Sequence, residues 1–178
     1  MKSKISKFLS LILRHKPETV GISLDINGWV NIDTLIEACK NHNHHITRSQ
    51  LDDVVTLNNK QRFAISTDGK CIRANQGHSI KVDLGLKSVK PPKLLYHGTV
   101  EKFMPAILKN GLLKMQRHHV HLSSDDNTAY SVGSRRGNPV VLGIKAELMH
   151  EKGYEFFVSE NGVWLTEKVP GKYLFRTN

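Results

Sequence analysis

The chain has 178 residues, of which 39% are hydrophobic and 24% are charged, and these proportions exclude a disordered, collagen-like or coiled-coil chain. A chain of this length forms one domain or two small lobes. No stretch approaches the ~20 consecutive apolar residues of a membrane span, and the two cysteines, Cys39 and Cys71, are too few for a disulfide framework. We therefore expect a soluble, cytoplasmic protein without membrane contact.

The charge is strongly basic. Lysine and arginine number 26 against 16 acidic residues, which gives a formal net charge of +10 at pH 7. The first 90 residues hold 14 basic and 8 acidic side chains and the remainder hold 12 and 8, so both halves share the excess. This balance predicts a polyanionic partner, RNA or DNA.

The first predicted element is an amphipathic helix over residues 3–15. Ser3 is its candidate N-cap, and Pro17 prevents its continuation. Four apolar residues recur at helical spacing in this segment: Ile5, Phe8, Leu9 and Ile12.

Two further helices and a hairpin follow. Asp33 is the expected cap of the second helix, and residues 47–50 have the capping-box pattern that starts a third. Short strands over 62–66 and 71–74 flank Asp68-Gly69, a strong hairpin signal. Three helices followed by a hairpin predict a winged helix.

The second half has a different pattern. Residues 83–93 are the best linker candidate, and a helix over 103–110 is expected to stop at Gly111. We expect an α+β protein whose second lobe has five short strands, over residues 94–97, 120–123, 140–144, 162–166 and 173–175.

Several catalytic motifs are absent, including the phosphate-binding loop, the dinucleotide-binding GxGxxG and the HExxH metal motif. One sequence cluster offers candidate zinc ligands: Cys39, His42, His44 and His45. Structural zinc sites usually need two spaced ligand pairs, so we favour a solvated polar turn there.

Some cations have both a structural and a functional explanation. Arg14 and His15 close the first helix, where cations also stabilise exposed carbonyl groups. Arg62 and Arg73 fall on the predicted hairpin, where arginines commonly contact nucleic-acid phosphates.

The run from Arg117 to His121 alternates in a way that would put Arg117, His119 and His121 on one face of a strand. That face would be rich in cations and hydrogen-bond donors. An exposed edge strand with ordinary polar residues is the alternative.

Seven strings occur in a fixed order: Leu13-Arg14-His15-Lys16-Pro17, Gly28-Trp29-Val30, Arg62-Phe63, Ile72-Arg73-Ala74-Asn75-Gln76-Gly77-His78-Ser79, Tyr96-His97-Gly98-Thr99, Arg117-His118-His119-Val120-His121-Leu122-Ser123 and Asn161-Gly162-Val163-Trp164-Leu165-Thr166. Together they resemble the KptA-type RNA 2′-phosphotransferase family, from about Ser6 to Leu174.

The resemblance implies a winged-helix RNA-binding lobe over residues 1–88 and an ADP-ribosyltransferase-like NAD-binding lobe over residues 89–178. It also implies an enzyme that removes an internal 2′-phosphate from RNA, of the tRNA splice-junction type, with NAD+ as acceptor. Nicotinamide and ADP-ribose 1″,2″-cyclic phosphate would be released, and a monomer without bound metal is expected.

By motif match, the family's catalytic set falls on Arg14, His15, Arg62 and Arg117. Guanidinium groups suit a phosphate monoester because they hold it bidentately. The histidine would either donate to a phosphate oxygen or move a proton, and the set would meet in a cleft between the lobes. Four further residues would bind substrate or organise the seam between the lobes: Arg73, Gln76, His78 and Ser79.

The NAD+ site implied by the resemblance comprises His97, Gly98, Thr99, His121 and Ser123. Arg135, in the turn 133–137, would meet a pyrophosphate or RNA backbone, with a solvated surface turn as the alternative. Val163 occupies the third signature position, where protein-modifying relatives often have glutamate, and a small shift in alignment would bring Glu160 there instead.

An apolar residue at that position favours a phosphate acceptor, because an ionised phosphate already carries the attacking charge and a carboxylate would repel it. Two other functions remain open. One is a noncatalytic winged-helix nucleic-acid binder, and the other is an ADP-ribosyltransferase that acts on nucleic-acid 5′-phosphates or on protein.

Overall fold

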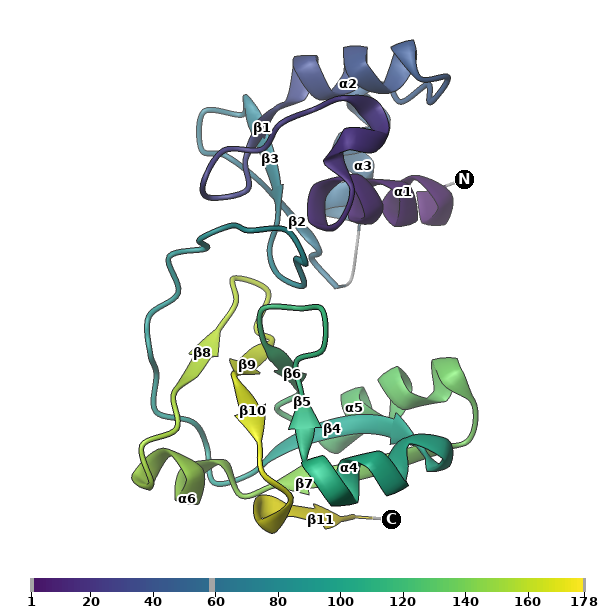
Figure 1. Cartoon of the computed structure of the whole chain (residues 1–178). Helices are drawn as coiled ribbons and strands as arrows, with labels where there is room; N and C mark the ends of the chain where they lie inside the picture. The colour runs from purple at the N-terminus through teal and green to yellow at the C-terminus, as the bar shows by residue number, and fades with distance from the viewer. Residues whose placement is uncertain (1, 58–59, 178) are drawn as a thin grey trace. The chain divides into compact units, whose positions relative to one another are not determined.

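The computed structural model describes residues 2–57 and 60–177 and divides into two compact units, Met1–Gly85 and Leu86–Asn178 (Figure 1). Each unit combines α-helices with small antiparallel sheets, so the chain is a mixed α/β protein. Each unit has its own hydrophobic core.

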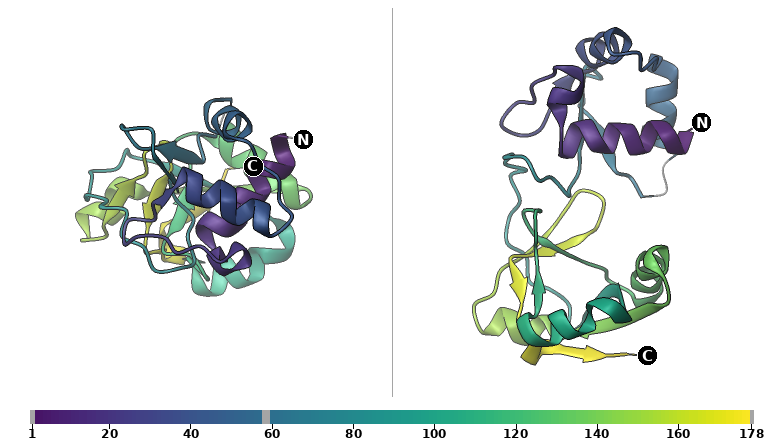
Figure 2. Two further views of the ribbon diagram at one scale, coloured as in Figure 1. Left: turned by 90° about the horizontal axis from the view of Figure 1, so that it is seen from above. Right: turned by 45° about the vertical axis from the view of Figure 1, so that its right-hand side comes forward.

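In the first unit, three α-helices pack beside one sheet, and the right-hand view of Figure 2 shows these helices. The described helices are α1 (Lys2–Arg14), η1 (Pro17–Val20, a 3-10 helix), α2 (Ile32–Asn41) and α3 (Arg48–Thr56). The sheet has the order β1-β3-β2 and comprises β1 (Val30–Asn31), β2 (Phe63–Ile65) and β3 (Cys71–Ala74).

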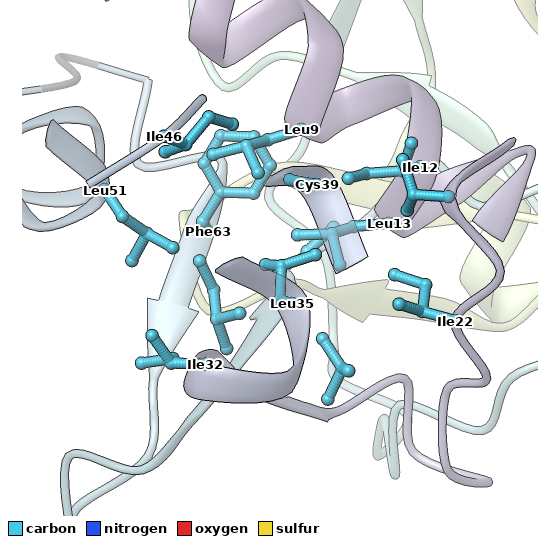
Figure 3. Packing of buried hydrophobic residues seen from close by; sticks show 14 of the residues in the cluster. Leu9, Ile12, Leu13, Ile22, Ile32, Leu35, Cys39, Ile46, Leu51 and Phe63 are labelled. Atoms are coloured by element: carbon cyan, nitrogen blue, oxygen red, sulfur yellow. The ribbon is translucent and has the colours of Figure 1, made fainter. Parts of the chain in front are cut away.

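The core of this unit forms where the apolar faces of the three helices meet the sheet (Figure 3). Leu13 of α1, Leu35 of α2 and Leu51 of α3 are almost fully buried, and Phe63 of β2 is 3% exposed. Burial of apolar side chains such as these stabilises the unit. It also fixes the last turn of α1 beside the start of β2.

The helix starts differ in part from the sequence predictions. Thr47 and Gln50 form the predicted capping box of α3. The prediction for α2 was wrong, because the side chain of Asn31 accepts hydrogen bonds from the amides of Asp33 and Thr34, which makes Asn31 the cap. Ser3 is not a cap either, since α1 already begins at Lys2.

The second unit alternates short strands and helices. Its described strands are β4 (Leu95–Val100), β5 (Leu112–Leu113), β6 (Val120–Leu122), β7 (Pro139–Ile144), β8 (Phe156–Val158), β9 (Trp164–Thr166), β10 (Lys168–Val169) and β11 (Leu174–Arg176). Its described helices are η2 (Glu101–Phe103), α4 (Met104–Asn110), α5 (Asp126–Gly133), η3 (Ser134–Arg136), α6 (Ala146–Glu151) and η4 (Gly171–Tyr173).

Three antiparallel sheets organise this unit, with the orders β11-β7-β4, β6-β9-β8 and β10-β5. The first two sheets touch where β4 passes the end of β6. There the amide of Tyr96 donates to the carbonyl of Ser123 (2.9 Å), and the amide of Ser123 donates to the carbonyl of Tyr96 (2.8 Å). This junction brings His97 next to His121.

Helix α5 lies directly against β4 because both elements have a glycine at the contact (Figure 1). A Cβ atom at Gly98 would overlap the carbonyl oxygen of Ala129. A Cβ atom at Gly133 would lie 2.7 Å from the carbonyl oxygen of Thr99. Backbone packing at this distance leaves no room for a side chain.

The strand predicted over residues 120–123 is confirmed by β6, but the alternating run from Arg117 does not extend it, because residues 117–119 form a bend. Part of the predicted linker packs on the unit instead: the amide of Val89 donates to the carbonyl of Phe156 (2.8 Å), and Pro91 is buried.

Within residues 2–57 and 60–177, none of the helices combines the length and the apolar character needed to cross a membrane.

Candidate active-site residues in the two units

Arg14 and His15 lie at the end of α1. The amides of His15 and Lys16 both donate to the carbonyl of Leu11 (3.0 and 2.9 Å), which closes the helix before Pro17. The Arg14 guanidinium then donates to the carbonyl of Arg62 (3.3 Å), 48 positions along the chain. Two of the predicted catalytic arginines are therefore neighbours in the first unit.

Arg62 is held through both its backbone and its side chain. Its carbonyl also accepts a hydrogen bond from the amide of Asn75 (2.9 Å), just beyond β3, and its guanidinium donates to the hydroxyl of Ser6 on α1 (3.4 Å). Asn75 is buried, and its side chain donates to the carbonyl of Gln61 (2.7 Å). The hairpin thus fixes Arg62 beside α1.

The segment after β3 brings Ser79 to His15. The Nδ1 atom of His15 lies 2.9 Å from the Ser79 hydroxyl. His78 is buried with 1% of its surface exposed, whereas Gln76 is half-buried. Arg73 lies nearby in sequence on β3, where its guanidinium stacks on the ring of Trp29 at 4.5 Å.

In the second unit, His97 of β4 is fixed by its neighbour strand. Its Nδ1 donates to the carbonyl of His121 (3.0 Å), which leaves Nε2 as a hydrogen-bond acceptor in the neutral ring. Burial lowers the pKa of His97 below 6.5, and the positive charges of Arg136 and Arg117 lower it further, whereas the bond to His121 opposes the shift. His97 is therefore neutral at pH 7.

Arg117 points back onto the same strand. Its guanidinium donates to Nδ1 of His121 (3.4 Å). Burial and the charge of Arg136 both lower its pKa. Two guanidinium groups whose charges act on each other favour the binding of an anion nearby.

Three of the residues predicted to bind NAD+ have evident structural roles. Gly98 gives room to α5, Thr99 is buried in the β4–β7 pairing, and the backbone of Ser123 bonds to Tyr96. Val163 is half-buried in the turn between β8 and β9, where its amide donates to the Ser159 hydroxyl (3.1 Å). Arg135 and Glu160 are exposed.

Comparison with known proteins shows which family the chain belongs to. A family model described as "RNA 2'-phosphotransferase, Tpt1 / KptA family" matches residues 1–168. This chain belongs to that family. Every residue predicted for the active site lies within the matched span.

Curated relatives of the RNA 2′-phosphotransferase family agree with this assignment. A "Probable RNA 2'-phosphotransferase" of Trichormus variabilis is 53% identical over 98% of this chain and 96% of that protein. Proteins with the same description from Nostoc punctiforme and Streptomyces coelicolor are each 54% identical over 96% of this chain, and cover 94% and 93% of their own lengths.

Sequence reasoning did not select Arg136, whose charge acts on His97 together with that of Arg117. The sequence singled out the turn 133–137 but selected Arg135 within it. The charge of Arg136 acts on both His97 and Arg117, and its guanidinium lies 6.0 Å from the ring of Phe103. A 3-10 turn follows α5, and sequence alone did not show which arginine of the pair faces β4.

The histidines considered as zinc ligands have other contacts. His42 donates from Nδ1 to the carbonyl of Ala38 (2.9 Å), and the ring of His44 stacks on Phe8 at 3.9 Å. Cys39 is buried, and burial raises its pKa to about 11. In the part of the chain that the structure describes, no three histidine, cysteine or acidic side chains are grouped as metal ligands.

Proposed function

We propose that this RNA 2′-phosphotransferase transfers an internal 2′-phosphate of RNA, of the tRNA splice-junction type, to NAD+. The observation that carries the proposal is the contact between the Arg14 guanidinium and the backbone carbonyl of Arg62, which makes Arg14, His15 and Arg62 neighbours in one unit. A phosphate monoester has a second pKa of ~6 and carries close to two negative charges at neutral pH. The negative charge and the acceptor oxygens of such a group suit the guanidinium groups of Arg14 and Arg62 and the imidazole of His15.

We propose that the first unit is a winged-helix RNA-binding lobe and the second an ADP-ribosyltransferase-like NAD-binding lobe. The order of α1, α2 and α3 before the β2–β3 hairpin supports the first assignment. The pairing of His97 with His121 on neighbouring strands supports the second.

In the first step of the proposed reaction, an oxygen of the RNA 2′-phosphate forms a bond to C1 of the nicotinamide ribose. The bond from C1 to the pyridinium nitrogen breaks, and its electron pair neutralises the ring as nicotinamide leaves. Arg14 and Arg62 orient the phosphate and reduce its charge repulsion. The product is RNA that carries a 2′-phospho-ADP-ribosyl group.

In the second step, the adjacent ribose 2″-hydroxyl attacks the phosphorus and the bond to the RNA 2′-oxygen breaks. The arginines stabilise the five-coordinate phosphorus, whose charge is greatest in this transition state. The hydroxyl proton is lost and the RNA 2′-oxygen gains one, so the step is balanced. His15 lies among these groups and either donates to a phosphate oxygen or moves the proton.

His97 suits a different task because it is neutral. With Nδ1 donating to the carbonyl of His121, its Nε2 accepts a hydrogen bond from a ribose hydroxyl. A neutral ring also avoids adding a third positive charge beside Arg117 and Arg136. Both properties favour binding of the dinucleotide ribose.

The half-buried, apolar Val163 supports a phosphate acceptor. A carboxylate there would repel an incoming phosphate, whereas a protein hydroxyl acceptor would need such a group for activation. Glu160, four residues after the start of β8, is exposed.

A comparison of acceptors tests the proposal. NAD+ consumption is measured with 2′-phosphorylated RNA, with 5′-phosphorylated DNA and with protein, and we expect rapid consumption with the first. Preference for the 5′-phosphate would favour an end-modifying ADP-ribosyltransferase. Binding of RNA without any NAD+ consumption would contradict the proposal.

A further inference from the structure

The backbone of Ser79 is fastened to the end of α1. Its amide donates to the carbonyl of Arg14 (2.9 Å), and the amide of Ile80 approaches the same carbonyl at 3.4 Å. The last carbonyl groups of a helix have no partner within the helix, so these bonds complete the end of α1. They also fix Ser79 relative to the Arg14–His15 pair.

The side chain of Ser79 makes a second contact with the same pair. Its Oγ lies 2.9 Å from Nδ1 of His15, 64 positions away in sequence. The residue before it, His78, is 1% exposed and packs against Gly28, which anchors the segment from behind. Ser79 thus holds the backbone of Arg14 and the ring of His15 at once.

A hydroxyl is a suitable partner for a histidine that changes its protonation state. It donates to Nδ1 when His15 is neutral with its proton on Nε2, and it accepts from Nδ1 when the ring is protonated. Because the hydroxyl both donates and accepts, the contact with Nδ1 is kept when the ring gains or loses a proton. The carbonyl that holds His97 only accepts, and it therefore makes Nε2 of that neutral ring an acceptor.

We propose that Ser79 is a positioning residue that holds the His15 ring, through Nδ1, in the orientation it needs toward the phosphate during transfer. The inference rests on the proposed function, in which His15 donates to the phosphate or moves a proton. It gives Ser79 a role in the chemical step and none in NAD+ binding. The loss of its hydroxyl should therefore lower kcat and leave KM for NAD+ unchanged.

The test compares Ser79→Ala and Ser79→Thr in 2′-phosphate removal from an RNA oligonucleotide at saturating NAD+. Misplacement of a catalytic group by about 1 Å costs up to ~100-fold, so we expect kcat of Ser79→Ala to fall by about 10- to 100-fold. KM for NAD+ should stay within about twofold of wild type, because ground-state binding is unaffected. The threonine variant retains the hydroxyl and should recover most of the loss.

Ser10→Ala is the matched control. The hydroxyl of Ser10 donates to the carbonyl of Ser6 (2.8 Å) on the same helix, so its loss also removes one hydrogen bond from the first unit. Its kcat should equal that of wild type. All three variants should unfold thermally close to the wild-type temperature, which excludes a general loss of structure.

Three results would overturn the inference: wild-type kcat in Ser79→Ala, equal losses in the alanine and threonine variants, or a loss that appears entirely in KM for NAD+. Each leaves the proposed function intact, because wild-type turnover is the reference. A wild-type protein without turnover would overturn the proposed function itself, and this inference with it.

Discussion

The neutral state of His97 matters both for the chemistry of the candidate site and for the stability of the folded protein. Burial and the charges of Arg117 and Arg136 lower the pKa of His97 in the folded protein below the ordinary value of 6.5. As the pH falls through 6.5, the unfolded chain takes up a proton at this residue before the folded protein does. Stability contributed by His97 is therefore complete above pH 6.5 and is lost as the pH falls toward the lowered pKa.

We expect the free energy of unfolding of the wild type to fall between pH 7 and pH 5, by chemical denaturation, more steeply than that of His97→Asn. Asparagine keeps a donor for the carbonyl of His121 but does not titrate. His119, whose pKa is also lowered by burial, is present in both proteins and does not affect the comparison. Parallel curves for the two proteins would show that the pKa of His97 is not lowered in the folded protein.

Gly98 allows a test of packing independent of catalysis. Because an added Cβ would overlap the carbonyl of Ala129, Gly98→Ala must displace α5 from β4. We expect a loss of at least about 2 kcal/mol in the free energy of unfolding.

Gly171→Ala is the control for Gly98→Ala, because its nearest atom, the carbonyl oxygen of Leu108, would lie 3.4 Å from the new Cβ. It should change stability by less than about 1 kcal/mol. Equal effects of the two substitutions would mean that the close approach of α5 to β4 is not maintained in solution.

At the scale of the elements, the start of helix α2 offers the clearest test of which residue acts as a helix cap. The side chain of Asn31 accepts from two amides of its first turn, whereas Asp33 lies within that turn. Asn31→Ala should therefore cost about 1 kcal/mol of stability, measured by chemical denaturation, and Asp33→Ala should cost less. The reverse order would restore the sequence-based choice of cap.

Local signals predicted the elements that depend on local chemistry. The capping box at Thr47, the hairpin turn at Asp68-Gly69 and the stop of α4 before Gly111 are all confirmed. The apolar face of α1 likewise predicted a helix that ends at Arg14-His15, and α1 ends at Arg14. In each case a few neighbouring residues determine the conformation.

Elements without a local signal were missed. Helix α5 has a weakly amphipathic sequence and is stabilised by contact with β4 through Gly98 and Gly133. Strands β5 and β10 have two residues each and exist because they pair with each other across more than 50 positions. Such pairings depend on tertiary structure, which no sequence window contains.

At the scale of the whole molecule, the candidate site also has residues that the sequence predicted and contacts that only the fold creates. Motif order selected Arg14, His15 and Arg62 as candidates, and the structure makes these three neighbours in the first unit. The role of Arg136, and the contact of Ser79 with His15, could not be predicted because each depends on how a turn packs against a distant element. Arg117 and His121 were identified correctly as neighbours, although through a bend at 117–119 and not along one strand.

Metal removal tests the charge balance of the proposed reaction. In that reaction nicotinamide leaves as a neutral molecule, and arginine side chains supply the positive charge that phosphoryl transfer requires. We therefore expect wild-type turnover in the presence of EDTA. Loss of turnover on chelation, restored by an added divalent cation, would contradict this expectation.

The most direct test of the central claim is mass spectrometry of the products after the protein is mixed with NAD+ and an RNA oligonucleotide that carries one internal 2′-phosphate. The account predicts nicotinamide, ADP-ribose 1″,2″-cyclic phosphate and RNA with a free 2′-hydroxyl. It also predicts that Arg62→Ala and Arg117→Ala, one from each unit, both suppress these products. Release of inorganic phosphate with NAD+ unchanged would contradict it.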